Sequence, residues 1–230
     1  MQPVLVVPGV HLLPFQIGQV YVWDWGDGLS VIDTSIAGSA PAILATVSAI
    51  GRQPQDVREI ILTHYHDDHR GSAAELAAAT GAQVVAHRAD APVIRGELQQ
   101  TPPVLMDFER PIAAAVMPLV PKVAGVPVDR EVEDGDLTLG GGLIVSVPGH
   151  TPGSIALVTP GPGPRVLFTG DTLAEHGGSV ILGVFNIDRA EAIRSAHKQA
   201  ALTFDAACFG HGVPVTSGAD RRIRDLVATL

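Results

Sequence analysis

Residues 63–71 read THYHDDHRG, and they follow REIIL (58–62), an apolar run with the pattern of a buried strand. The stretch holds three histidines and two aspartates. Such groups are costly to bury unless they are paired or bind a metal ion. The stretch is therefore either a polar surface loop or one half of a metal site, and the second reading requires more ligands elsewhere in the chain.

The spacing inside the stretch favours a metal site. In an extended chain residues i and i+2 point to the same side, so His64 and His66 can bind one ion together. Asp68 and His69 come where the chain turns towards a helix that we expect after Ser72, so they can face a second ion about 3.5–4 Å away. Imidazole and carboxylate ligands without a thiolate suit zinc, and also iron or manganese.

Three further candidate ligands also follow apolar runs. His150 comes after LIVSVPG, Asp171 after VLFTG and His211 after AACFG. Alone, His150 could belong to a turn and Asp171 could cap a helix. Because the ends of strands can meet at one edge of a sheet, where a rigid scaffold holds polar loops, we expect these residues to complete one site with the first stretch.

Composition narrows the class of protein. The chain has 230 residues, of which 46% are apolar and 17% charged, as in a globular protein with a sizeable core. Its formal net charge of −9 argues against binding to nucleic acid or to anionic membranes, because both require clustered lysine and arginine. We expect a small-molecule substrate and no nucleic-acid or membrane partner, and a homodimer remains open.

Localisation is expected to be cytoplasmic. The N-terminal residues 1–15 contain three prolines and lack the basic region and cleavage site of a signal peptide. No apolar run reaches the roughly 18 residues that span a bilayer. The single cysteine, Cys208, lies in an apolar context and is expected to be a buried hydrophobic residue.

The remaining pattern predicts an α/β protein with two sheets in a single domain over residues 1–230. Helix starts are expected at two capping boxes, one formed by Ser72 and Glu75 and the other by Asp188 and Glu191. The expected elements, taken from periodicity and turn signals, are a hairpin over 18–33, strands over 58–63, 82–87, 143–147, 155–159, 166–170 and 206–210, and helices over 40–50, 72–81, 89–96, 188–200 and 218–230.

Residues 99–127 break this pattern. Prolines alternate there with apolar residues, so we expect a long loop without regular structure. Loops of this length inside a domain are uncommon and often functional. The segment is either a connection that covers the core or a lid that forms a wall of the substrate site, and an apolar lid would suit an apolar substrate.

Four motifs resemble those of a known family. THYHDDHRG, PGHTPGS, TGDT and FGHG are similar to the metal-binding motifs of the metallo-β-lactamase superfamily, and VIDTS with Asp33 resembles the strand end that precedes them. The His-Thr-Pro-Gly-Ser sequence is closest to the glyoxalase II-like branch. The resemblance implies a four-layer αββα sandwich (the metallo-β-lactamase fold), in which two mixed β-sheets are flanked by helices. Residues 212–230 leave no room for the glyoxalase II C-terminal domain, which we therefore do not expect.

The resemblance also implies a role for each motif residue. It implies two divalent metal ions, with zinc first and iron or manganese as alternatives. Asp33 would orient the histidine loop through hydrogen bonds, although a strand-end turn residue is the other reading. The implied ligands are His64, His66 and His150 for one metal and Asp68, His69 and His211 for the other, with Asp171 between them.

A dinuclear site of this kind implies a hydrolase. Two metal ions sharing a water lower its pKa towards 7, and the resulting hydroxide can attack a carbonyl carbon without a serine or cysteine nucleophile. Asp68 would be catalytic, orienting the hydroxide and taking up its proton. Candidate substrates are carboxylic derivatives, namely thioesters, lactones, esters and β-lactams, and the apolar segment favours an acyl chain.

Three other residues are candidate substrate contacts: Tyr65, His176 and Asn186, each with a packing or surface role as the alternative. Two other functions remain open. One is a mononuclear iron oxidoreductase of the persulfide dioxygenase type, and the less favoured one is a nucleic-acid phosphodiesterase, because the chain is acidic. Metal analysis of protein purified without added metal distinguishes the first of these from a dinuclear hydrolase.

Overall fold

Seven strands form the first β-sheet of the computed structural model, which describes residues 2–230. The first four strands pair antiparallel as a meander, and β4 to β7 then pair parallel, so the sheet is mixed. The strands lie in sequence order: β1 (Val4–Val7), β2 (Val10–Leu13), β3 (Val20–Asp24), β4 (Leu29–Ile32), β5 (Val57–Ile61), β6 (Gln83–His87) and β7 (Arg130–Val132).

Four strands form the second sheet, in the order β13, β10, β9, β8. This sheet is also mixed, because β10 pairs parallel with β13 and antiparallel with β9. A separate hairpin joins β11 (Leu173–His176) to β12 (Ser179–Leu182). The bounds of the sheet strands are β8 Leu143–Ser146, β9 Ile155–Val158, β10 Val166–Phe168 and β13 Ala206–Cys208.

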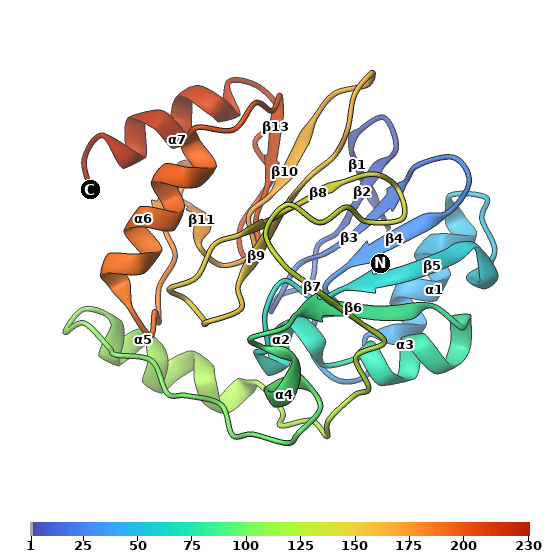
Figure 1. The fold of residues 1–230 in the computed structure, drawn as a ribbon, viewed down its shortest axis with the longest axis horizontal. Helices are drawn as coiled ribbons and strands as arrows, with labels where there is room; N and C mark the ends of the chain where they lie inside the picture. The colour runs from blue at the N-terminus through green and yellow to red at the C-terminus, as the bar shows by residue number, and fades with distance from the viewer. Residues whose placement is uncertain (1) are drawn as a thin grey trace.

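Helices cover the outer face of each sheet (Figure 1). On one side α1 (Ala40–Ala49) and α3 (Ala73–Thr80) pack against the first sheet through Ile43, Val47 and Leu76. On the other side α6 (Arg189–Ala200) and α7 (Ala219–Val227) pack against the second sheet through Ala192, Ala196 and Ile223. The expected four-layer αββα sandwich is confirmed.

A third apolar cluster lies between the sheets and joins them. Ile32 and Val85 of the first sheet belong to it together with Ile144 and Phe168 of the second. Strands that are buried on both faces read as continuous apolar runs, which is why EIIL, VLF and AAC were recognisable in the sequence. Among residues 2–230, no helix combines the length and the apolar character needed to cross a membrane.

Short helices connect these layers. Two of them flank the candidate site: α2 (Asp67–Arg70) and α4 (Ala91–Ile94). Short 3-10 helices occur at Pro54–Asp56 and Met117–Leu119. The expected helices over 40–50, 72–81 and 188–200 are present with ends within two residues of the prediction.

One predicted capping box is wrong. Ser72 does precede α3, but its hydroxyl makes no bond to the first turn. It donates instead to the Ile36 carbonyl at 2.8 Å and accepts from the Ser39 N–H at 2.7 Å, so a tertiary contact has taken the place of the cap. At the other predicted box Asp188 does accept from the Glu191 N–H at 2.9 Å, while the Glu191 side chain pairs with Arg194.

The expected loop over 99–127 is also partly wrong, because it contains a helix, α5 (Glu109–Val116). Pro111 is one of the prolines that made a loop the expectation. It lies in the first turn, where a backbone N–H has no intrahelical acceptor and its absence costs nothing. Glu109 accepts from the Met106 N–H at 2.8 Å and the Phe185 N–H at 3.1 Å, which ties the start of α5 to the second half of the chain.

Candidate metal centre

Seven histidine and aspartate side chains gather at one edge of the sandwich, and each comes after a strand. His64 and His66 follow β5, and Asp68 and His69 lie on α2, immediately beyond them. His150 follows β8, Asp171 follows β10 and His211 follows β13. Both sheets therefore contribute residues to a single site, as the strand-end argument predicted.

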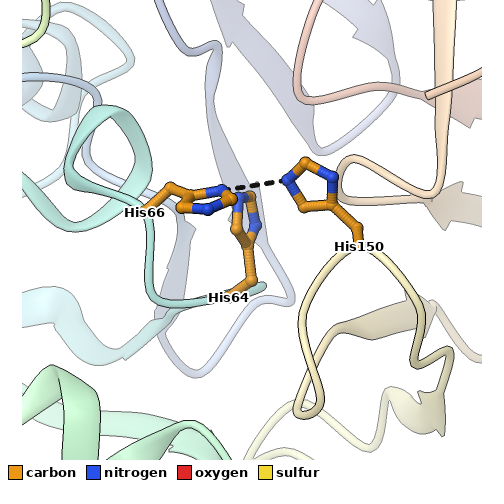
Figure 2. A group of neighbouring side chains, drawn as sticks. All are labelled: His64, His66 and His150. Atoms are coloured by element: carbon orange, nitrogen blue, oxygen red, sulfur yellow. Dashed lines mark hydrogen bonds between the residues drawn. The ribbon is translucent and has the colours of Figure 1, made fainter. Parts of the chain in front are cut away.

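Donor atoms in this cluster fall into three groups, each within 4.8 Å: His64, His66 and His150; His64, His69 and Asp171; Asp68, His69 and His211. In the first group the three imidazoles converge, with His66 Nδ1 3.0 Å from His150 Nε2 (Figure 2). In the third, His69 Nε2 lies 3.3 Å from His211 Nε2. The middle group shares His64 with the first and His69 with the third, so the three groups are continuous.

One oxygen of Asp171 lies at the centre of the cluster. Oδ2 is 3.2 Å from His211 Nε2, 3.4 Å from His69 Nε2 and 3.6 Å from His150 Nε2. It is also 4.0 Å from His64 Nε2. A carboxylate with nitrogens of both histidine groups around one oxygen is placed where a bridging ligand would be needed.

Unpaired atoms indicate that the cluster suits a metal. Within residues 2–230, His64 Nε2 and Asp171 Oδ1 are buried and have no hydrogen-bond partner. A buried polar atom without a partner costs roughly 1–3 kcal/mol, so a native site leaves few of them unexplained. Nitrogen and oxygen donors converging without sulfur fit zinc, iron or manganese, and an ion would satisfy these atoms.

Electrostatics differ between the two ends of the cluster. Burial lowers the pKa of His66 to about 3 and also lowers the pKa values of His64 and His150, so these imidazoles stay neutral at pH 7. Burial also disfavours the cation of His211, but the nearby Asp171 and Asp68 outweigh it and raise the pKa of His211 to about 10. The His211 end therefore favours positive charge, which a proton or a metal ion can supply.

Asp33, for which the resemblance implied hydrogen bonds to the histidine loop, contacts Thr63 and His69. Its carboxylate accepts from the Thr63 N–H at 2.8 Å, the Thr63 hydroxyl at 2.7 Å and His69 Nδ1 at 2.8 Å. Because the Thr63 hydroxyl donates to Asp33, it accepts from His64 Nδ1 at 3.0 Å. His64 therefore carries its proton on Nδ1 and leaves Nε2 free to face the cluster. His69 also holds a proton on Nδ1; burial disfavours its cation, but Asp171, Asp68 and Asp33 outweigh burial and raise its pKa, so a metal ion would replace a proton on Nε2.

Two glycines allow the backbone to come this close. A Cβ on Gly210, just before His211, would lie 2.0 Å from Asp171 Oδ1. A Cβ on Gly18, whose φ is +64°, would lie 1.9 Å from the Asp68 carbonyl oxygen. No larger residue fits at either position, because contacts below 3.0 Å force the backbone to move.

Comparison with known proteins agrees with this geometry. The sequence pattern of the metallo-beta-lactamase superfamily matches residues 14–211. The chain belongs to the metallo-β-lactamase superfamily. It is a hydrolase of that superfamily, whose members use metal ions, typically zinc.

Two relatives illustrate the range of the superfamily. The probable metallo-hydrolase YflN of Bacillus subtilis (strain 168) is 29% identical, over 90% of this chain and 85% of that protein. A hydroxyacylglutathione hydrolase of Fuscovulum blasticum is 32% identical, over 75% of this chain and 55% of that protein. The chain thus spans about half the length of the hydroxyacylglutathione hydrolases that it matches.

Solved metallo-β-lactamases share the fold. One with a HARLDQ motif, from Cronobacter sakazakii, is 26% identical with a TM-score of 0.70, over 92% of this chain and 78% of that chain. MIM-1 of Novosphingobium pentaromativorans is 21% identical with a TM-score of 0.74, over 99% of this chain and 87% of that chain. At 21% identity the second likeness shows the superfamily fold alone.

The three candidate substrate contacts differ in how deeply they are buried. Tyr65 is buried, and its hydroxyl donates to the Thr101 carbonyl at 3.2 Å. Asn186 is buried and donates to the Gly183 carbonyl at 2.6 Å, while its Oδ1 has no partner within residues 2–230. His176 is exposed at the end of β11. None of the three belongs to the metal-ligand groups, and a contact with substrate stays a prediction.

Two buried charged residues that contact the loops of the site were missed in the sequence. Arg70, on α2, donates from Nε to the Tyr65 carbonyl at 2.9 Å, from one terminal nitrogen to the Ala124 carbonyl at 3.1 Å and from the other to Asp67 at 2.7 Å. Asp90 accepts three hydrogen bonds from loops of the site. Asp90 follows a strand just as the metal ligands do, so the rule that found His150 would have found it too.

Proposed function

We propose that the protein is a dinuclear metal-dependent hydrolase of carboxylic derivatives, with acyl thioesters, lactones and esters ahead of β-lactams. The observation that carries the proposal is the continuous set of seven donor residues, in which two groups of three are linked by Asp171. A site for one ion would need only one of these groups. The relatives named hydroxyacylglutathione hydrolase support an acyl thioester in particular.

The proposed ligands divide into two sets. His64, His66 and His150 would hold one ion and Asp68, His69 and His211 the other, with Asp171 between them and zinc as the first choice. When bound, such ions make a water molecule acidic and polarise the carbonyl group of a substrate.

Asp68 is the proposed acid–base group. One of its oxygens lies 3.4 Å from His211 Nε2, and burial, which raises its pKa, is outweighed by His69 and His211, so the pKa is lowered. The carboxylate is therefore ionised at neutral pH and can accept the proton that the attacking water gives up. No serine or cysteine nucleophile is required, and Cys208 is buried between the sheets.

An exposed apolar strip supports an acyl substrate. The segment that carries it is attached to the site, because Gln100 Nε2 donates to the Tyr65 carbonyl at 3.5 Å and the Val104 N–H donates to the Asn186 carbonyl at 2.9 Å. We propose that this strip forms a wall for the acyl chain. Its exposed side chains are Val104, Met106, Phe108, Ile112, Val116, Met117 and Leu119.

Two alternatives are less well supported. A mononuclear iron persulfide dioxygenase would use the three histidines with Asp171 and would leave the group of Asp68, His69 and His211 without a metal. A nucleic-acid phosphodiesterase would have to bind a polyanion with a chain of net charge −9.

A ligand variant tests the proposal. We expect His66→Ala to lower hydrolysis across a panel of thioesters, lactones and esters by more than about 100-fold, since even the partners of metal ligands are worth about 10- to 100-fold. His197→Ala, at an exposed position of α6 outside the ligand groups, is the matched control. Equal activity of wild type and His66→Ala, with both folded, would rule out the proposed site.

A further inference from the structure

Asp90 is a fully buried carboxylate outside the metal-ligand groups. Its exposed fraction is 0%, and it lies between β6 and α4. Its hydrogen-bond donors within residues 2–230 are all neutral: two backbone N–H groups and one hydroxyl. A carboxylate held in this way marks a point where the fold needs a strong acceptor for several donors at once.

These donors come from two loops that are distant in the sequence. Asp90 Oδ2 accepts from the Tyr65 N–H at 3.1 Å and from the Thr151 hydroxyl at 2.6 Å. Asp90 Oδ1 accepts from the Gly153 N–H at 2.7 Å. Tyr65 is the residue between His64 and His66, so one carboxylate joins the first histidine loop to the loop that carries His150.

The relative position of those loops decides the geometry of the three-histidine group. His66 Nδ1 belongs to the first histidine loop and His150 Nε2 to the second, and the two atoms lie 3.0 Å apart. Metal–ligand distances tolerate deviations of only about 0.2 Å. A small shift of one loop against the other would therefore separate the nitrogens that have to bind the same ion.

Gly153 shows how closely the His150 loop packs against Asp90. A Cβ at this position would lie 2.7 Å from both Cγ and Oδ1 of Asp90 and 2.6 Å from its backbone nitrogen. Contacts below 3.0 Å are not found for real Cβ atoms, so only glycine lets the loop approach the carboxylate. The second glycine of the PGHTPGS motif, Gly153, is thus required by its contact with Asp90.

An amide could not replace the carboxylate here. All three partners point a donor at Asp90, and an asparagine side chain would set its own NH₂ group against one of them. Burial also raises the pKa of Asp90 to about 6, so the carboxylate is costly to keep in place. A purely space-filling role would not need a group of this kind.

We propose that Asp90 is a positioning residue that holds the His64–His66 loop against the His150 loop and so raises the affinity of the three-histidine group for its metal. The inference rests on the proposed function in taking this group as a metal site. Asp33 acts differently, because it orients the rings of His69 directly and of His64 through the Thr63 hydroxyl, whereas Asp90 joins two loops.

Metal titration of matched variants tests the proposal. The metal-free protein is titrated with Co²⁺ against a competing chelator and followed by visible absorption, for wild type, Asp90→Asn and Glu59→Gln. Glu59 is the matched control because it is also fully buried and accepts from Ser30 and from the Leu139 N–H, in none of the metal-ligand groups. We expect Asp90→Asn to weaken one of two Co²⁺ equivalents by about 10- to 100-fold and Glu59→Gln to weaken neither.

The outcomes separate a positioning role from a structural one. If both variants lose stability and both keep wild-type Co²⁺ affinity, Asp90 serves the fold alone and the inference is overturned. If Asp90→Asn does not fold, Thr151→Val is used instead, because it removes one of the three donors and leaves the carboxylate in place. Wild-type Co²⁺ affinity in Thr151→Val would then overturn the inference. If wild type itself binds no Co²⁺, the proposed function fails first.

Discussion

Single residues orient the histidines of the centre through the ring nitrogens that face away from it. The Thr63 hydroxyl holds Nδ1 of His64, and Asp33 holds Nδ1 of His69. These bonds decide which nitrogen is free to face the cluster, because a neutral imidazole carries one proton. The network is buried, so each member that is lost leaves others without a partner.

Replacing Asp33 is expected to destabilise the metal-free protein. Asp33→Ala leaves the Thr63 N–H, the Thr63 hydroxyl and His69 Nδ1 without their acceptor in the interior. We expect the free energy of unfolding in urea to fall by about 3 kcal/mol. Asp27→Ala, in the exposed hairpin turn, should stay within about 0.5 kcal/mol of wild type, and equal losses in both variants would contradict the role of Asp33.

The histidines also predict a pH dependence of the metal-free protein. His64, His66 and His150 have pKa values lowered by burial, so below about pH 6.5 the unfolded chain binds more protons and stability falls as the pH falls. Asp90, with its pKa raised to about 6, acts in the opposite direction but is one group against three. The pKa of His211 is raised to about 10, so its contribution is complete below pH 6.5 and is lost as the pH rises towards 10.

Stability of the metal-free protein should therefore be greatest near pH 6.5. The urea midpoint measured from pH 5 to pH 9 checks this, with exposed His176→Gln as a variant that should reproduce the wild-type profile. A midpoint that rises steadily from pH 6.5 down to pH 5 would show that the buried histidines are not neutral in the folded protein.

Among the elements, the segment around α5 differs most from its prediction, because a loop was expected where the structure has a helix. Its alanines and its proline in the first turn suit a helix. Several of its large apolar side chains, however, are not buried by any other part of residues 2–230. Figure 1 shows α5 along the lower end of the molecule, below α6 and on the side where α2 and α4 lie. This placement fits an element that serves the substrate more than the core.

Removing the apolar face of α5 should change substrate preference. Phe108 and Ile112 are one turn apart and exposed, so Phe108→Ser with Ile112→Ser should cost little stability. If an acyl chain packs on them, KM for a long-chain thioester or lactone should rise about tenfold while KM for a short-chain substrate is unchanged. Arg110→Ser, exposed on the same helix, is the control, and equal effects on both chain lengths would contradict a chain-binding wall.

Ser72 and Glu75 give a second test at this scale. Ser72→Ala should lower the free energy of unfolding by about 1–3 kcal/mol, because it removes the contacts to Ile36 and Ser39 that hold α3 against the loop before α1. Glu75→Ala should change it by less than about 0.5 kcal/mol, because Glu75 is exposed and caps nothing. Similar losses of stability in both variants, measured by urea unfolding, would indicate that Ser72 and Glu75 do form a capping box.

In the whole molecule, what could be predicted follows from periodicity and from strand ends. The strands before His64, Asp171 and His211 end in buried apolar runs, so they were visible in the sequence, and the polar residues after them were expected to meet at one edge. Asp33 was proposed only from the resemblance to the family, and the structure adds its contacts to Thr63 and His69.

Long-range contacts could not be predicted. Ser72 bonds to residues more than 30 positions away, and Asp90 bonds to a loop more than 60 positions away, so no local pattern shows which donors each will meet. Arg70 was not singled out in the sequence, although its guanidinium joins α2 to the end of the apolar segment at Ala124. Such contacts depend on how the layers pack.

Metal content measured together with hydrolysis tests the central claim most directly. Protein purified without added metal is analysed for bound metals by mass spectrometry, and the same sample is assayed on thioesters, lactones, esters and β-lactams. The account predicts about two divalent ions per chain, and hydrolysis of an acyl thioester or lactone that is lost with a chelator and regained with metal. One iron per chain with oxygen consumption, or two ions with no hydrolysis in the whole panel, would contradict it.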